Sequence, residues 1–360
     1  MTSSDPNPAA HPLHLTNTTA LPGGEAVPRP GWTQRRSTIL GVAVSVACVV
    51  ALLQSVDLGQ VAGALAGATI WPLAISIALT FITVACRAWR WQALLLPDAR
   101  ARFWPAVEAT LVGYLIIAVL PGRVGELSRA ALLGRTERTS TARALGSIAI
   151  EKLYDVGALF VILGTLSVLI EVPGWARAAA LAVGAAFTAF IVAFGLAVAS
   201  RARLVQWFEA RVDPLSVFRG RRPSRIAEGL LGAGSSFRSP RLIAVHVIAT
   251  TVLWSIAIGQ TYLGTLAFHL GTGWEAAAFL LVATNLGMTV PSAPASLGVY
   301  HGITVLSLEA FGTDREVALA LAIGLHALGF GTLAVAGGAC LAFGIGRHRF
   351  GLADLWRWRT

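Results

Sequence analysis

The sequence has few charged residues and few cysteines, and both shortages exclude protein classes. Only 13% of its 360 residues are Asp, Glu, Lys or Arg, whereas 55% are apolar. Soluble domains have about a quarter charged residues, so this composition excludes an ordinary cytosolic enzyme and a disordered chain. The three cysteines, Cys48, Cys86 and Cys340, lie within apolar runs and form no CxxC pair. They therefore indicate neither a disulfide scaffold nor a metal site.

Lysine is almost absent, and the basic residues are 27 arginines and the single Lys152, against 18 acidic residues. The resulting pI is about 10.8. In a membrane protein such a value reflects cationic loops that are retained on the cytoplasmic side. We therefore expect no nucleic-acid partner.

Eight apolar segments approach the roughly 20 residues that are needed to cross a bilayer. They are 38–56, 70–95, 104–120, 144–170, 177–199, 241–269, 275–290 and 316–345. If all eight crossed the membrane, the loops 121–143 and 200–241, with five and nine arginines, would lie outside. The positive-inside rule opposes both placements.

The conflict disappears if segments 104–135 and 275–311 enter the membrane and return to the same side, because only Arg177 and Arg315 then remain outside. The predicted fold is an all-α polytopic membrane protein with about six full transmembrane helices, two re-entrant helical hairpins and cytoplasmic termini. The hairpin breaks are assigned to Pro121, Gly122, Gly125, Pro291, Pro294 and Gly298. Span, span, hairpin, span then occurs twice with opposite orientation, an inverted repeat typical of transporters. In the alternative, the prolines and glycines merely kink two full spans, which leaves the arginine distribution unexplained.

One transmembrane domain, 37–345, is expected, with halves of about 37–171 and 172–345. It lies between a disordered tail, 1–36, and a basic tail, 346–360. A signal peptide is the alternative for the first apolar run, but the leader would be far too long. Trp, Phe and Leu among the arginines of 200–240 predict amphipathic helices on an anionic inner leaflet. Arg87 and Arg90, beside Trp89 and Trp91, are interpreted as an interfacial anchor.

Ionisable residues within apolar segments indicate the candidate site, because a charge at the bilayer centre costs about 2.5–3.5 kcal/mol. Glu151 and Asp155 share one helix face. The predicted substrate-binding residues are Arg123, Glu126, Arg129, Glu151, Lys152, Asp155, Asn285, Ser292, Ser296 and His301. Two interpretations stay open: a structural network that fastens the first hairpin to its neighbour, and a polar cavity whose arginines hold an anionic headgroup. His301 either titrates near neutrality or is a structural hydrogen-bonding residue.

Three motifs carry a family resemblance: Leu120-Pro-Gly-Arg-Val-Gly-Glu-Leu-Ser-Arg129, Glu151-Lys-Leu-Tyr-Asp155 and Pro291-Ser-Ala-Pro-Ala-Ser-Leu-Gly298. In this order they resemble the lysylphosphatidylglycerol synthase transmembrane-region family, a group of flippase-like integral membrane proteins, over about 38–345. The resemblance implies an inner-membrane protein whose relatives move a phospholipid between leaflets. It also implies that Arg123, Glu126, Arg129, Glu151 and Asp155 occupy the family's charged positions. Lys152, His301 and Ala295 depart from the arginine, glutamate and glycine that are common there.

The predicted function is that of a lipid flippase or translocator for an anionic phospholipid or a lipid-linked intermediate in the plasma membrane, without a cofactor. The chain ends shortly after its last span, so we expect no soluble aminoacyl-transferase domain and no synthesis of lysyl-lipid by this chain alone. One alternative is a lipid-dependent glycosyltransferase, although a long outer loop and the HExxH, GxSxG and metal-ligand motifs are missing. The other is a non-catalytic partner of a separate lipid-modifying enzyme.

Overall fold

Helices make up nearly all of the chain that the computed structural model describes, namely residues 43, 45–96, 100–120, 124–137, 139–214, 223–289 and 293–343. No strand occurs within these ranges. The helices are Ser45–Gln54, α2 (Leu58–Ala66), α3 (Ile70–Leu95), α4 (Phe103–Val119), α5 (Val124–Thr136), α6 (Thr141–Leu169), α7 (Gly174–Ala199), α8 (Arg201–Arg211), α9 (Pro223–Gly232), η2 (Ala233–Arg238), α10 (Pro240–Ala267), α11 (Trp274–Gly287), η3 (Pro294–Ser296), α12 (Val299–Glu309) and α13 (Arg315–Phe343).

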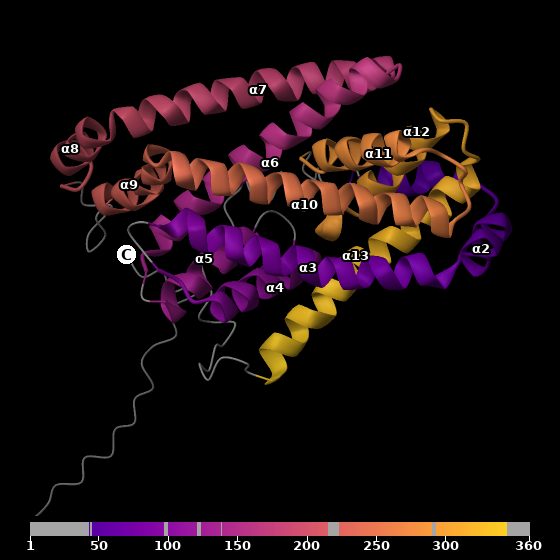
Figure 1. The fold of residues 1–360 in the computed structure, drawn as a ribbon, viewed down its shortest axis with the longest axis horizontal. Helices are drawn as coiled ribbons and strands as arrows, with labels where there is room; N and C mark the ends of the chain where they lie inside the picture. The colour runs from indigo at the N-terminus through magenta and orange to yellow at the C-terminus, as the bar shows by residue number, and fades with distance from the viewer. Residues whose placement is uncertain are drawn as a thin grey trace, which may run out of the picture.

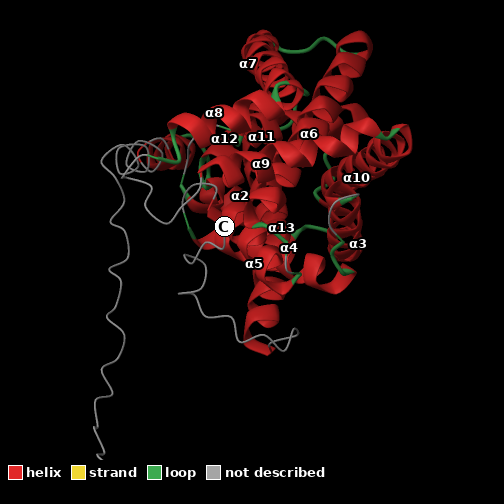
Figure 2. Cartoon of the chain, turned by 90° about the vertical axis from the view of Figure 1, so that its left-hand side faces the viewer, coloured by secondary structure: helices red, strands yellow, loops and turns green. Residues whose placement is uncertain are grey.

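Five of these helices, α3, α6, α7, α10 and α13, are long and apolar enough to cross a membrane. A sixth span is present if the helix Ser45–Gln54 and α2, which meet at 93°, are one bent span. The predicted all-α polytopic fold with about six full spans is therefore confirmed, and the chain is a multi-pass membrane protein. Of these spans α7 is the least covered: it lies at the margin of the bundle in Figure 2, and its most apolar window has no buried residue.

Four shorter helices occupy the two segments that were predicted to be hairpins. α4 and α5 have 17 and 13 residues and pack on each other, as do α11 and α12 with 14 and 11 residues. At 1.5 Å per residue they are roughly 17 to 26 Å long, which is shorter than the hydrocarbon core of about 30 Å. Their lengths suit hairpins that turn back within the bilayer, and the re-entrant arrangement stays a prediction.

The backbone at the second predicted break is irregular and touches the first helix. Ala295 and Ser296 have φ of 54° and 55°, in the left-handed region, and Gly298 has φ of 83°. A Cβ at Gly298 would overlap the carbonyl oxygen of Ser45, whose hydroxyl accepts a hydrogen bond from the Ala293 amide at 2.8 Å. Glycine is therefore required here both for its conformation and for the close approach. Pro121, Gly122 and Pro291 lie outside the described residues.

The contacts between helices follow an internal two-fold pattern. α3 of the first half packs on α10 of the second. α4 packs on α13, just as α11 packs on α6. The contacting pairs α3–α4 and α5–α6 correspond to the contacting pairs α10–α11 and α12–α13. Exchanging α3–α6 with α10–α13 leaves these partnerships unchanged. In Figure 1, α3 and α10 run side by side along the length of the molecule, with α4–α5 towards one end and α11–α12 towards the other.

Two polar contacts between α3 and α10 repeat the pattern at the level of single residues. Arg90, the twenty-first residue of α3, donates from Nη1 to the hydroxyl of Thr250, the eleventh residue of α10, at 2.7 Å. Gln260, the twenty-first residue of α10, donates from Nε2 to the hydroxyl of Thr80, the eleventh residue of α3, at 3.0 Å. Reciprocal contacts of this kind require antiparallel helices and are typical of a two-fold axis. They support the predicted inverted repeat.

Candidate functional site

Seven charged side chains meet where α3, α5 and α6 converge, and we call them the charge cluster. They are Arg87 and Arg90 of α3, Glu126 and Arg129 of α5, and Glu151, Lys152 and Asp155 of α6. Six ion pairs of 2.7 to 3.4 Å join them. Five of the ten predicted substrate-binding residues are thus brought together.

Glu151 is the centre of the cluster. Its side chain is 1% exposed, and three arginines surround it: Arg129 Nη2 lies 3.0 Å from Oε2, while Arg90 Nη2 and Arg87 Nη1 lie 3.3 and 3.4 Å from Oε1. A buried carboxylate is tolerated only when cations and hydrogen-bond donors replace the lost water. The ring of guanidinium groups meets that requirement, so Glu151 can stay ionised.

Asp155 lies one helical turn further along α6 and shares two of these arginines. Arg90 Nη1 donates to Oδ1 at 2.7 Å, and Arg87 Nη1 lies 3.3 Å from Oδ2. The spacing of four residues places Glu151 and Asp155 on the same face of α6, so a single guanidinium can reach both. Arg90 thereby links α6 to α3 and, through Thr250, to α10.

The interpretation of residues 87–91 as an interfacial anchor is wrong for Arg90 and Trp91, because both are completely buried. α6 and α10 cover this face of α3, whereas Trp89 on another face is half exposed. The sequence did contain a signal for the missing cations. Two carboxylates one turn apart in an apolar helix need more positive charge than the neighbouring Lys152 supplies.

Trp91 holds Arg129 in position. The guanidinium carbon of Arg129 lies 4.0 Å from the centre of the indole ring, and the indole Nε1 donates to the Ser147 hydroxyl at 2.8 Å. Cation–π contacts are stronger when they are desolvated, and Arg129 is 8% exposed. The buried Nε atoms of Arg129 and Arg90 have no hydrogen-bond partner among the described residues. Donor capacity therefore remains in the cluster.

Glu126 and Lys152 form the outer part of the cluster. Lys152 Nζ lies 3.0 Å from Glu126 Oε1, and their side chains are 40% and 22% exposed. The pair connects the first hairpin to α6 beside the buried ion pairs. Because water reaches both groups, the pair can open at a lower free-energy cost than a buried pair.

A close helix crossing places α5 and its charges against α4. A Cβ at Gly125 would overlap the carbonyl oxygen of Gly113 and the Ile117 side chain. Only glycine permits this approach, so Gly125 acts as a contact point within α5 and not as a helix break. The crossing gives the cluster an apolar wall on one side.

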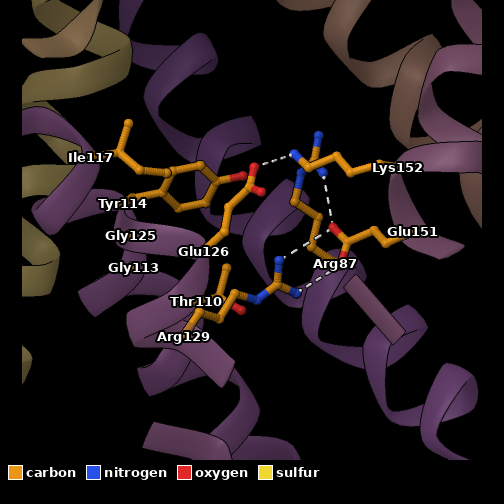
Figure 3. Close-up of a pocket in the computed structure, with 10 residues that line it drawn as sticks. All are labelled: Arg87, Thr110, Gly113, Tyr114, Ile117, Gly125, Glu126, Arg129, Glu151 and Lys152. Carbon is orange, nitrogen blue, oxygen red and sulfur yellow. Dashed lines mark hydrogen bonds and ion pairs between the residues drawn. The ribbon is translucent and has the colours of Figure 1, made fainter. Parts of the chain in front are cut away.

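A pocket opens between this wall and the charge cluster (Figure 3). The cavity itself is about 30 Å³, room for one or two water molecules, and the space reaches about 310 Å³ when the open solvent at its mouth is included. Charged groups form one side, and Tyr114, Ile117 and the glycines form the other. The lining residues are Arg87, Thr110, Gly113, Tyr114, Ile117, Gly125, Glu126, Arg129, Glu151 and Lys152.

The residues predicted from the second half do not line this pocket. Asn285 Nδ2 donates to the carbonyl oxygen of Leu281 in its own helix at 2.8 Å, and Ser296 lies in the irregular η3 turn. His301 stacks on His326 of α13. The structure therefore does not bring the predicted residues of the second half into this pocket. Arg123 and Ser292 lie outside the described residues.

In the part of the chain that the structure describes, no group of three or more His, Cys, Asp or Glu side chains could hold a metal ion. The chemistry of the pocket is therefore that of cations, carboxylates and hydrogen-bond donors beside an apolar surface.

Comparison with known proteins finds one family over most of the chain. The family described as "Lysylphosphatidylglycerol synthase TM region" matches residues 38–337, which include the charge cluster and both pairs of short helices. No curated protein matches the chain.

Proposed function

Because the chain belongs to the lysylphosphatidylglycerol synthase TM-region family, whose members are membrane proteins of lipid metabolism or transport, we propose that it is a lipid translocator. It moves an anionic phospholipid or a lipid-linked intermediate between the leaflets of the plasma membrane. Both termini lie in the cytoplasm, and the helices of the 200–240 segment rest on the anionic inner leaflet.

The charge balance of the pocket carries this proposal. The cluster holds four cations, Arg87, Arg90, Arg129 and Lys152, against three carboxylates. Among the described residues, the cluster therefore carries one more positive than negative charge, in a region that apolar helices surround. A phosphodiester supplies one negative charge, and guanidinium groups bind phosphate oxygens with paired donors.

The route for a headgroup follows from the exposure of the cluster. The Glu126–Lys152 pair faces the open side, whereas Glu151 and its arginines are buried behind it. A phosphate that reaches the pocket can take the place of the Glu126 carboxylate beside Lys152. It can then accept a hydrogen bond from Nε of Arg129, which has no partner among the described residues. The acyl chains stay in the bilayer, because the outer surfaces of the spans are apolar.

The competing interpretation is that the cluster only fastens the first hairpin to α3 and α6. Two matched variants separate the interpretations, because Lys152→Gln and Glu126→Gln break the same ion pair and change the net charge in opposite directions. If the cluster only fastens the hairpin, both variants have the same effect. If the cluster binds an anion, Lys152→Gln is the harmful one.

The test measures the movement of fluorescent lipids across liposomes that contain the purified protein. For anionic lipids we expect Lys152→Gln to lower the rate about tenfold, the value of one charge-assisted hydrogen bond. Glu126→Gln should keep at least the wild-type rate.

A zwitterionic lipid is the control for headgroup charge. Equal losses for the two variants would show that the pair only fastens the hairpin. Wild-type rates equal to those of protein-free liposomes, for phospholipids and polyprenyl lipids alike, would remove the proposal.

A further inference from the structure

The second hairpin carries two histidines at the positions where the first hairpin has its exposed ion pair. Glu126 is the third residue of α5 and Lys152 the twelfth of α6, and they meet at 3.0 Å. His301 is the third residue of α12 and His326 the twelfth of α13, and their ring centres lie 5.0 Å apart. The same two helix positions therefore make contact in both halves.

The other positions of the charge cluster have uncharged counterparts in the second half. By the same numbering within helices, the counterparts of Arg90, Arg129, Glu151 and Asp155 are Gln260, Thr304, Leu325 and Gly329. The second half thus keeps the helix packing without the permanent charges. Among the described residues, its ionisable contacts between α12 and α13 are the histidine pair and, beside the turn that joins the two helices, the Glu309–Arg315 ion pair.

The surroundings of the pair are aromatic, with His326 buried and His301 partly buried. His326 is 7% exposed and lies nearly parallel to His301, at 22°, and to Phe330, at 20° with 4.6 Å between ring centres. Tyr300 meets His326 edge-on at 4.9 Å. The Nδ1 atoms of both histidines are buried and have no hydrogen-bond partner in the part of the chain that the structure describes. Buried polar atoms are rarely left unpaired, and each such case requires an explanation.

The other ionisable groups of the neighbouring helices lie away from the pair. Tyr300 is the described ionisable side chain in ring contact with it. Glu309 and Arg315 pair with each other at 2.6 Å. Glu309 is eight residues from His301 and Arg315 is eleven residues from His326, which is roughly 12 and 17 Å along the helix axes. The remaining ionisable groups on the helices that pack against α12 and α13 have no described hydrogen bond, ion pair or ring contact with either imidazole. They are Arg87, Arg90, Glu108, Tyr114, Arg241, His246, Tyr262, Glu275 and Glu316.

We propose that His301 and His326 form a proton-binding site that controls the contact between the second hairpin and α13. A hydronium ion transfers its proton to the lone pair of an imidazole nitrogen, so that an O–H bond breaks, an N–H bond forms and a water molecule is left. The closed contact resists this charge because His326 is buried and because two imidazolium rings 5.0 Å apart repel each other. Once the hairpin has moved away from α13, water can solvate the charge. Protons therefore bind the open form in preference and shift the population towards it.

The proton site deepens the proposed lipid movement, because inverted-repeat transporters open and close the two halves around one site. The Glu126–Lys152 pair and the histidine pair are the equivalent contacts on the two hairpins. The first joins an acidic to a basic side chain, and the second is released by acid.

The experiment follows the hairpin and not the lipid. Spin labels at Leu306 of α12 and Val335 of α13, both exposed, report the distance between the hairpin and the span in lipid nanodiscs. The native cysteines are first replaced by serine. Between about pH 8 and about pH 5, the range over which histidine changes its charge, we expect the distance to increase in the otherwise wild-type chain. The double variant His301→Phe with His326→Phe keeps the ring stacking and should lose the response.

His246→Phe is the matched control, because His246 is also buried, lies 5.4 Å from the Tyr154 ring between centres and has no hydrogen-bond partner among the described residues. This variant should respond like the wild type. Nitrogen-15 spectra of histidine-labelled protein should show proton uptake by signals that the double variant lacks. A wild-type distance that does not change with pH, or an unchanged response in the double variant, overturns the proton site. Either result leaves the proposed lipid movement untouched, because the liposome assay tests it separately. If the protein moves no lipid but the distance still changes with pH, only the proposed translocator function is refuted.

Discussion

Replacing Arg90 with methionine would remove one cation from the interior of the charge cluster while nearly preserving side-chain length. Arg90 is completely buried and contacts Asp155 at 2.7 Å and Glu151 at 3.3 Å. With an effective dielectric constant of about 20, the Coulomb attractions are roughly 6 and 5 kcal/mol. Most of this attraction offsets the cost of burying the charges. Removal of one partner from a buried network therefore costs about 3–5 kcal/mol, because Asp155 keeps only the longer contact with Arg87.

The assay is the free energy of unfolding of the purified protein in detergent micelles. Arg87→Met is the matched control, because Arg87 touches the same two carboxylates at 3.3 to 3.4 Å but is 19% exposed. We expect it to cost about 1 kcal/mol, as water screens the interaction. The double variant Arg90→Met with Asp155→Leu removes both buried charges and should be more stable than Arg90→Met alone.

Two outcomes would refute this reasoning about Arg90. A loss of less than about 1 kcal/mol in Arg90→Met would show that the carboxylates are not buried ions that depend on it. A double variant that loses the sum of the two single losses would show that the two side chains do not act as a pair.

Two further predictions concern the packing around the cluster. Gly125→Ala should destabilise the protein by about 1–3 kcal/mol, because the new Cβ would overlap the backbone of α4. Gly157→Ala on α6 places its Cβ in open space and should be neutral or slightly stabilising. Thermal unfolding of both variants tests this difference. Trp91→Phe removes the hydrogen bond to Ser147 and weakens the ring contact with Arg129. It should cost about 1–3 kcal/mol in the free energy of unfolding. If the variant moved lipid more slowly but unfolded like the wild type, Trp91 would not stabilise the fold by holding Arg129.

The spans were predictable because a membrane imposes a simple length rule. Segments 70–95 and 241–269 are apolar over the 20 or so residues that a bilayer requires, and α3 and α10 match them within two residues. No comparable length rule determines where the helices inside the hairpins bend or end. The role of Gly125 depends on the helix that faces it, and a glycine in the sequence does not indicate whether it bends a helix or admits a neighbour.

The pairing of charges was only half predictable. Glu151 and Asp155 were visible as one face, because their spacing within a single helix determines it. The cations opposite them depend on how α3 is rotated about its axis, and the alternation of Arg and Trp at 87–91 resembles the pattern of an interfacial belt. The counterpart contact of His301 was hidden for the same reason, because His326 is 25 residues away on another helix.

The two hairpins differ in chemistry although their helices pack alike. Movement of α5 away from α6 would separate Arg129 from Glu151, which are 3.0 Å apart and 91–99% buried at their side chains, and unpaired buried charges are costly. Movement of α12 away from α13 separates apolar side chains and imidazole rings, whose contacts each contribute about 0.5–1.5 kcal/mol. The ion pair described between these helices, Glu309–Arg315, lies beside the turn that joins them and is partly exposed. The first hairpin is therefore the fixed wall of the pocket, and the second is the one that a single proton can move.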